Sequence, residues 1–350
     1  QDLVIGLGTG ITPDNLAVFA GSLRKVSPNS ALVLFLDAPL PDRHKEIVNK
    51  YGITALEFSV DLLQPQYLAK YHPSNYRWPL LYRYLSKHAS EYGKVLLADV
   101  RDSMFQKDPF AEFSTGFFAF HGVESRTIKE CGWNGGWVKD CFGNAMLDKI
   151  GKNTIICSGV SMGSTPEVVE YLRAMTHIME SDEFAKCERN GVDQGVHNVL
   201  VHTNQIPGLK IYSQANGWVA NLQAGRSKVV GADVQNGQGK QVAVVHQYDR
   251  RRDLQTAYFN EYIFWDHQSE AAAMCARFTI EEDVELFKAR CDMRVTSGHS
   301  NAACCEKCLN TPNCKGWSAA GSQCFLKNCN NVGSANRIAM RGVASGYLTS

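Results

Sequence analysis

The sequence lacks a continuous apolar segment of the roughly 18 residues that a bilayer-spanning helix needs. It also lacks an excess of charge of either sign, because 36 Lys and Arg residues stand against 35 Asp and Glu residues and the formal net charge is +1. Binding to nucleic acid or to an anionic membrane through overall charge is therefore not expected. Nothing near Gln1 has the pattern of a signal peptide, and the chain does not begin with Met. We expect a form from which an N-terminal targeting or anchoring segment has been removed.

The composition is that of a folded protein. Hydrophobic residues make up 44% and charged residues 20% of the 350 residues, which excludes disorder as the main state. This length allows one domain of about 250 residues and a second, smaller one.

The twelve cysteines are unevenly distributed, since eight of them lie between Cys275 and Cys329. An even number of cysteines in a short region rich in Asn, Ser and Gly predicts a disulfide-stabilised module, because the core of such a module is too small to fold unaided. Disulfides in turn indicate an oxidising compartment. Cys305 and Cys308 have the CxxC spacing of zinc ligands, but a zinc ribbon needs a second close pair, so zinc is the weaker alternative.

Short apolar runs alternate with helical segments from Asp2 to Asp102. Strands are expected at 3–7, 31–36, 53–58 and 94–98, and helices beginning at Thr12–Asp14 and spanning about 43–50 and 79–91. This alternation predicts βαβ units and an α/β fold with a mostly parallel sheet. Ligands of such sheets bind beyond the carboxyl ends of the strands, here at 6–12, Asp37 and 99–102.

The middle of the chain is less regular. Strands are expected at 117–120, 155–162 and 241–245, helices are expected to open at Ser164 and near Asp193, and 236–240 is expected to be a loop. The stretch from about 268 to 283 is interpreted as a join, which divides the chain into domains 1–268 and 283–350.

Two carboxylates, Asp99 and Asp102, follow directly after an apolar strand. Mg²⁺ or Mn²⁺ is usually held by one or two carboxylates with phosphate oxygens and water, so this strand end is suited to a metal-bound nucleotide diphosphate. His246 ends another apolar run, and a neutral imidazole would complete a metal site with Asp102. The alternatives are that Asp102 caps the turn, that Asp99 pairs with Arg101, and that His246 is a hydrogen-bonded surface residue.

The segment 96–110, LLADVRDSMFQKDPF, resembles the metal-binding segment of GT-A fold nucleotide-sugar glycosyltransferases. In that family an Asp-x-Asp-like element ends a strand and precedes a short apolar run and Asp-Pro. Further pieces stand in the family's order: 156–164 is similar to the Asn-Ser-Gly strand, Asp193-Gln194 to the acidic pair that opens a helix at the reaction centre, and His246 to the late metal ligand. The resemblance covers about residues 2–255.

The resemblance implies a Rossmann-like GT-A catalytic domain. It implies transfer of a sugar from a nucleoside-diphosphate donor, with a UDP-sugar favoured, to a hydroxyl of a glycan or glycoprotein acceptor, with Mn²⁺ or Mg²⁺ as cofactor and with retention favoured. The residues it points to are Asp99, Asp102 and His246 for the metal, Asp193 and Gln194 for catalysis, and Asp99, Ser158 and Gly159 for the donor.

Other candidates come from the residues themselves. Gly6, Gly8 and Thr9 form a Gly-rich first turn that would let the backbone approach a nucleotide. The guanidinium of Arg77 would clamp a diphosphate or hold a carboxylate, with a solvated charge as the alternative.

This chain departs from the family pattern at two places. Two residues, rather than one, separate Asp99 and Asp102, and Cys157 replaces the Asn of Asn-Ser-Gly. A disulfide from Cys157 to Cys187 would leave Ser158 and Gly159 as the recognition elements. A bridge between Cys131 and Cys141 would close a small loop whose tryptophans, Trp133 and Trp137, could stack on a sugar.

The cysteine-rich tail is similar to PAN/Apple domains, through a helix with CxxxC followed by a further Cys and by Cys-x-Leu-Lys. The resemblance implies a small α+β domain that binds proteins or carbohydrates and is not catalytic. It suggests the pairs Cys304–Cys324 and Cys308–Cys314, with Cys305 pairing to Cys329 or Cys291.

Together these features predict an enzyme of the secretory pathway, most simply in the Golgi lumen, or a secreted protein. Its partners would be a nucleotide sugar and a glycan or glycoprotein, without nucleic acid and with a membrane only through a removed anchor. The alternative from another class is a secreted carbohydrate- or protein-binding protein with a non-catalytic GT-A-like domain.

Overall fold

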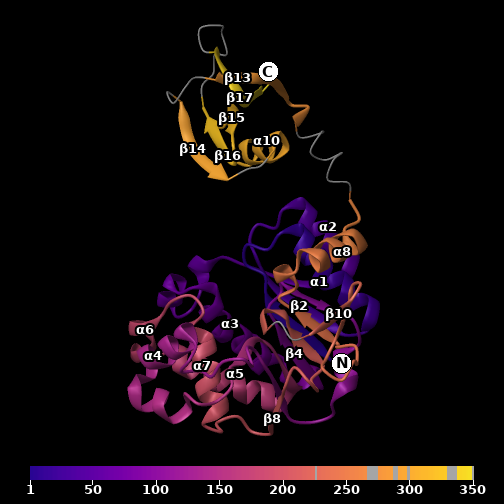
Figure 1. Ribbon diagram of the computed structural model, residues 1–350, viewed down its shortest axis with the longest axis vertical. Helices are drawn as coiled ribbons and strands as arrows, with labels where there is room; N and C mark the ends of the chain where they lie inside the picture. The colour runs from indigo at the N-terminus through magenta and orange to yellow at the C-terminus, as the bar shows by residue number, and fades with distance from the viewer. Residues whose placement is uncertain (225–226, 266–274, 287–290, 298–299, 329–336, 349–350) are drawn as a thin grey trace. The chain divides into compact units, whose positions relative to one another are not determined.

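The computed structural model describes residues 1–224, 227–265, 275–286, 291–297, 300–328 and 337–348. The chain divides into two compact units, Gln1–Ile263 and Phe264–Ser350 (Figure 1). Each unit has its own sheet and its own buried core, and each is described by itself.

A seven-stranded sheet forms the centre of the first unit. Its strands are β1 Leu3–Leu7, β2 Ala31–Asp37, β3 Thr54–Phe58, β4 Lys94–Ala98, β6 Phe117–His121, β7 Ile156–Ser164 and β8 Leu209–Tyr212. They are ordered β3-β2-β1-β4-β7-β6-β8, and of these strands only β7 runs against the others. The prediction of an α/β fold with a mostly parallel sheet is confirmed.

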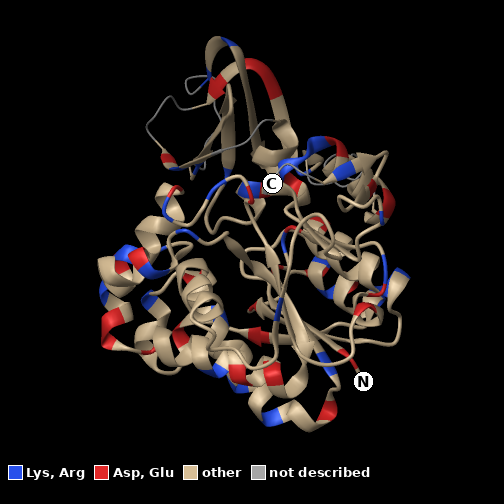
Figure 2. Cartoon of the chain, turned by 60° about the horizontal axis from the view of Figure 1, so that its bottom comes forward, with Lys and Arg blue, Asp and Glu red and all other residues tan. Residues whose placement is uncertain are grey.

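Helices cover the sheet. They are α1 Pro13–Val26, α2 Asp42–Tyr51, α3 Pro73–His88, α4 Gly132–Ile150, α5 Thr165–Met179, α6 Asp182–Cys187, α7 Val192–His202 and α8 Arg252–Tyr262. Leu3 and Ile5 of β1 belong to one buried cluster with side chains of α3, α5 and α7. Elsewhere in the unit, α1 packs against α2 and α8. Positively and negatively charged residues are interspersed along the helices, in keeping with the balanced charge (Figure 2).

The helix starts follow local capping chemistry. The Thr12 side chain accepts a hydrogen bond from the Asn15 N–H, and Pro13 occupies the first turn of α1, as expected. The third helix begins earlier than the predicted 79–91, because a ring nitrogen of His72 accepts from the Ser74 N–H and caps α3 at Pro73. Pro79 therefore lies inside α3, and Arg77 is carried by the helix.

A three-stranded sheet joins two later segments of the chain to the segment that follows β4. Its strands are β5 Ser103–Phe105, β12 Val244–His246 and β9 Val219–Asn221, with β12 in the centre. The strand predicted at 241–245 is β12, which begins later, at Val244, and ends one residue later, at His246. A hairpin of β10 Lys228–Val230 and β11 Asp233–Gln235 completes the described strands of this unit.

Among its described residues, the second unit has an antiparallel sheet with a helix packed against it. Its elements are β13 Phe278–Leu286, β14 Asp292–Ser297, α10 Asn301–Leu309, β15 Gly316–Ala320, β16 Gln323–Lys327 and β17 Arg337–Leu348. The strands are ordered β13-β17-β15-β16-β14. Of the predicted join at 268–283, residues 268–274 lie outside the described residues, and the chain from Phe278 already forms β13.

Disulfides stabilise this unit. Cys304–Cys324 and Cys308–Cys314 pair as predicted. Cys305 pairs with Cys275, so the predicted pairing of Cys305 with Cys329 or Cys291 is wrong. Because Cys305 and Cys308 are both oxidised, the zinc alternative is excluded for this pair.

Trp317 is fully buried in the core of the second unit. A Cβ atom at Gly346 would lie 2.6 Å from its ring, so this strand position requires glycine. Among the described helices of the chain, none is both long and apolar enough to cross a membrane.

Candidate metal site

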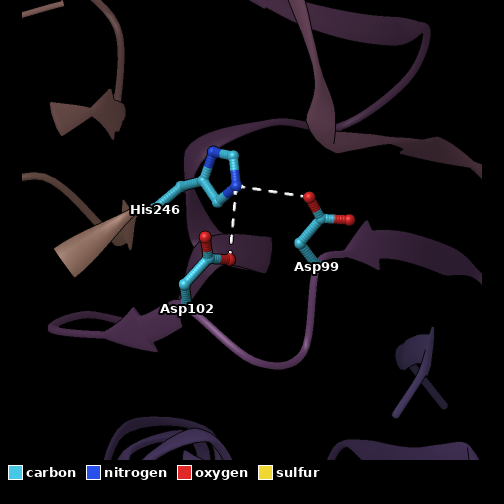
Figure 3. Close-up of side chains that lie close together, drawn as sticks. All are labelled: Asp99, Asp102 and His246. Atoms are coloured by element: carbon cyan, nitrogen blue, oxygen red, sulfur yellow. Dashed lines mark ion pairs between the residues drawn. The ribbon is translucent and has the colours of Figure 1, made fainter. Parts of the chain in front are cut away.

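Asp99, Asp102 and His246 lie together in the first unit, with one potential ligand atom of each within 4.8 Å of the others. The Nε2 atom of His246 lies 3.4 Å from Oδ2 of Asp99 and 3.5 Å from Oδ1 of Asp102 (Figure 3). A nitrogen and two carboxylate oxygens that converge in this way form a donor set suited to a divalent cation such as Mn²⁺.

The seven-stranded and the three-stranded sheet position these three side chains. Asp99 directly follows β4, and its N–H donates to the carbonyl of Gly159 on β7 at 2.7 Å. Asp102 directly precedes β5, whose first residue, Ser103, is the register partner of His246 on β12. A hydrogen bond of 2.7 Å from the Gln247 N–H to the Asp102 carbonyl closes the same corner. The site therefore forms where the end of β4 meets the small sheet.

His246 is held in one orientation by Asn221, its register partner on β9. The Asn221 Nδ2 donates to the His121 carbonyl at 2.8 Å, which turns Oδ1 toward His246. Nδ1 of His246 donates to that Oδ1 at 2.7 Å. The hydrogen on Nδ1 leaves Nε2 with its lone pair directed at the two carboxylates, which is the tautomer that a metal ligand needs.

The site is buried and is not satisfied by protein groups alone. His246 is 1% exposed, and among the described residues neither its Nε2 nor Oδ1 of Asp102 has a hydrogen-bond partner. Burial lowers the pKa of His246, but the charge of Asp102 and the adjacent Cys157 outweigh burial and raise that pKa above its usual value. Buried carboxylates and imidazoles that lack partners favour either a proton or a cation between them, so the residues fit a bound divalent metal.

Gly159 leaves room for the side chains of His246 and Asp99. A Cβ atom at this position would lie 2.2 Å from Cε1 of His246 and 2.9 Å from Oδ2 of Asp99. Only glycine allows the ring and the carboxylate to occupy the same side of β7. Its role is therefore to leave room for the metal ligands.

Arg77 of α3 links the metal site to Asp193 of α7. Its guanidinium forms ion pairs with Asp99 and, at 2.8 Å, with Oδ2 of Asp193. The Ser158 hydroxyl donates to the same Asp193 oxygen at 3.2 Å. Of the alternatives for Arg77, the geometry shows the one in which its guanidinium holds carboxylates, and it fixes the buried carboxyl group of Asp193 next to the candidate metal site.

A pocket with a volume of about 450 Å³ opens onto this cluster. Among the predicted site residues, those that line it are Thr9, Arg77, Asp99, Asp102, Ser158, Asp193 and Gln194. Gly6, Gly8, Gly159 and His246 are not among the described lining residues. A Cβ at Gly6 would lie 2.6 Å from the Ala98 carbonyl and one at Gly8 2.7 Å from the Leu36 side chain, so both glycines allow close strand packing.

Neither cysteine pairing considered for this unit forms. Cys141 is bonded to Cys187, and Cys131 and Cys157 are free thiols. Cys131 immediately precedes α4 and Cys141 lies ten residues further on, a separation of about 15 Å along a helix axis, so they cannot meet. Cys157 instead lies on β7 with its sulfur 3.7 Å from Nδ1 of His246.

Sequence reasoning missed Asn221, which carries no motif and lies in a strand of three residues.

No protein-family model and no curated protein matches the chain. The functional interpretation therefore depends on the geometry of the site.

Proposed function

We propose that the protein is a divalent-metal-dependent glycosyltransferase with a GT-A-like first unit. The observation that carries the proposal is the convergence of Asp99, Asp102 and His246 at the end of β4, next to a pocket that also contains the buried Asp193. The donor would be a nucleoside-diphosphate sugar, with UDP favoured, and the acceptor a hydroxyl of a glycan or glycoprotein.

In this proposal Asp99, Asp102 and His246 would hold Mn²⁺ or Mg²⁺, which would neutralise the charge that develops on the leaving diphosphate. The two carboxylate oxygens of Asp99 have different partners. Oδ1 pairs with Arg77, and Oδ2 faces Nε2 of His246. This arrangement orients the ligand before any substrate arrives, so little reorganisation is needed when the donor binds.

Asp193 would face the anomeric carbon or orient the acceptor hydroxyl. Arg77 and Ser158 both bind its Oδ2 atom and hold the carboxylate in one orientation. Gln194 donates from Nε2 to Oδ1 of Asn134 at 2.9 Å, which ties the start of α7 to α4. These contacts support a positioning role for Gln194 and a reaction-centre role for Asp193.

The setting is an oxidising one, as the four described disulfides indicate. We include in the proposal that the protein is located in the Golgi lumen or outside the cell. We also include that the second unit binds the acceptor, as a PAN/Apple-like domain would.

The proposal is tested by calorimetry with UDP and GDP, with Mn²⁺ or with a chelator, and by turnover assays with a panel of nucleotide sugars. We expect metal-dependent nucleotide binding and metal-dependent hydrolysis or transfer, both lost in Asp102→Ala. Asp42→Ala is the matched control, because the Asp42 side chain is 94% exposed on α2. Nucleotide binding that is independent of metal would remove the proposed metal role, and metal-dependent binding without turnover of any donor would favour a non-catalytic binding protein.

A further inference from the structure

The lining of the pocket divides into two chemically different parts. The part around the metal site is charged and contains Arg77, Asp99, Arg101, Asp102, Asp193 and Arg250. Apart from Asp193, the lining residues at or just before the beginnings of α4 and α7 are of uncharged types, and they include Cys131, Trp133, Asn134, Trp137, Asn190 and Gln194. We call the second set the neutral wall. Charge suits a metal-bound diphosphate, whereas a wall of rings and amides suits a neutral ligand.

Trp133 is the most unusual residue of the neutral wall. Its side chain is 72% exposed although tryptophan is a large residue that is usually buried. Its ring centroid lies 6.1 Å from that of Trp137, at an interplanar angle of 38°. The exposed ring thus rests next to a second ring and presents an apolar surface to the pocket.

The ring of Trp137, which lies next to Trp133, is closely packed against α7 and the residue that precedes it. A Cβ atom at Gly191 would lie 2.6 Å from its ring, and one at Gly195 would lie 2.8 Å from its Cβ. The two glycines therefore let α4 and α7 approach closely at this point. Because Asp193 lies between them in the sequence, the ring of Trp137 is fixed relative to the proposed reaction centre.

Three further contacts fix α4 in place. The Cys141–Cys187 disulfide joins α4 to α6. Arg189 pairs with Asp140 at 2.6 Å, and Gln194 donates to Asn134 at 2.9 Å. An exposed tryptophan on so firmly held a helix is prearranged to bind a ligand at little conformational cost.

We propose that the neutral wall is the acceptor site and that Trp133 stacks on a neutral pyranose ring of the acceptor glycan. A pyranose has an apolar C–H face that matches the indole surface, and its hydroxyls match the amides of Asn134, Asn190 and Gln194. An anionic sugar would find no cation among the described residues of this wall. The inference rests on the proposed function and specifies the substrate class at its acceptor side.

The experiment uses the full chain loaded with Mn²⁺ and UDP. The probes are neutral gluco-, manno- and galacto-oligosaccharides of four to six units, with sialylated and uronic-acid oligosaccharides as the charged counterparts. Calorimetry measures affinity, and saturation-transfer NMR identifies the contacted sugar rings. Trp133→Ala is expected to weaken binding of a neutral oligosaccharide by about tenfold or more, and Trp133→Phe by only about threefold.

Two comparisons make the result specific. Tyr67→Ala removes another exposed aromatic side chain, 39% exposed and outside the lining of the pocket, and should leave oligosaccharide affinity unchanged. UDP affinity in the presence of Mn²⁺ should be the same in all three variants. Equal oligosaccharide affinity in Trp133→Ala and the unaltered protein would place glycan binding elsewhere and overturn the inference, as would a preference for the charged oligosaccharides.

The same measurements separate this inference from the proposed function. Metal-dependent UDP binding without binding of any neutral oligosaccharide would overturn the acceptor site alone. Oligosaccharide binding that depends on Trp133, without any UDP binding, would keep a carbohydrate site and remove the transferase.

Discussion

The Oδ1 atom of Asn221 lies 2.7 Å from Nδ1 of His246, and this hydrogen bond determines which ring nitrogen faces Asp99 and Asp102. Asn221 is in turn oriented by its bond to the His121 carbonyl. The hydrogen-bonded series His121–Asn221–His246 thus extends the candidate metal site one layer beyond its three potential ligands. Side chains in such a layer orient the ligands of a metal site and tune its affinity for metal.

Replacement of Asn221 should therefore weaken metal binding without removing a ligand. In Asn221→Ala we expect Mn²⁺ affinity to fall by about 10- to 100-fold, because the imidazole loses its fixed tautomer and orientation. Asn221→Asp keeps an acceptor for Nδ1 but loses the Nδ2 donor to the His121 carbonyl, so it should retain only part of the affinity. Mn²⁺ titrations followed by electron paramagnetic resonance measure this, and equal affinity in Asn221→Ala and the unaltered protein would contradict it.

Gly159→Ala should abolish the site by steric conflict. The added methyl would lie 2.2 Å from the His246 ring, so the ring or β7 must move, at a cost of about 1 to 3 kcal/mol in the free energy of unfolding. Gly136→Ala on α4 is the control, since its Cβ would come no closer than 3.8 Å to a described neighbouring atom outside the helix backbone. That change should raise the free energy of unfolding by up to about 1 kcal/mol. Thermal unfolding and Mn²⁺ binding of both variants provide the comparison.

Cys131 should react as a thiolate at lower pH than an ordinary cysteine. Burial raises its pKa, but hydrogen bonds from the backbone and side chain of Asn134 and from the Trp133 backbone outweigh burial and bring the pKa below its ordinary value of 9.0. Since the thiolate is the reactive form, the rate of alkylation by iodoacetamide should reach half its maximum below pH 9.0.

The same reaction reports on the pocket. Asn134→Ala should move the midpoint of Cys131 alkylation to higher pH, and the buried Cys157 should remain unmodified. Because Cys131 lines the pocket, a bound ligand there should slow its alkylation. Mass spectrometry after timed quenching distinguishes the two thiols, and an unshifted midpoint in Asn134→Ala would show that these hydrogen bonds do not control the thiol.

Loss of one tail disulfide should affect the second unit and spare the metal site. Cys304 and Cys324 are 20 residues apart, and removing such a cross-link costs about 3 kcal/mol through the larger entropy of the unfolded chain. The variant Cys304→Ala/Cys324→Ala should show an earlier unfolding step in calorimetry with Mn²⁺ affinity unchanged. A matching loss of Mn²⁺ affinity would show that the second unit supports the site.

The α/β fold and the grouping of Asp99, Asp102 and His246 could be predicted from local sequence, whereas their role as metal ligands stays a prediction. Asp99 follows the apolar strand β4 and His246 ends the apolar strand β12, so both lie at strand ends, where ligands of α/β sheets bind, although the two strands belong to different sheets. Asn221 could not be predicted, since its role depends on the pairing of β9 with β12 and no local signal marks it. The start of α3 was missed because a histidine, rather than one of the usual capping residues, precedes Pro73.

Cysteine pairing was predicted where a family pattern fixed it and missed where it did not. Cys304–Cys324 and Cys308–Cys314 follow the tail motif. The bond from Cys141 to Cys187 joins two helices whose packing the sequence does not encode locally. Trp133 was noticed as a candidate for stacking, but the sequence placed it in a disulfide loop, whereas it lies on a helix.

The central position of β12 in the small sheet has a consequence for biosynthesis. This strand contributes His246 and is the only described strand that joins β5 to β9, although it follows both of them in the chain. When Asp99 and Asp102 of a growing chain have left the ribosome, His246 has not yet been synthesised, and β5 still lacks its partner strand β12. The three candidate metal ligands therefore cannot come together until the first unit is almost fully synthesised. A divalent cation bound by all three would stabilise finished chains and leave partly made ones free to rearrange.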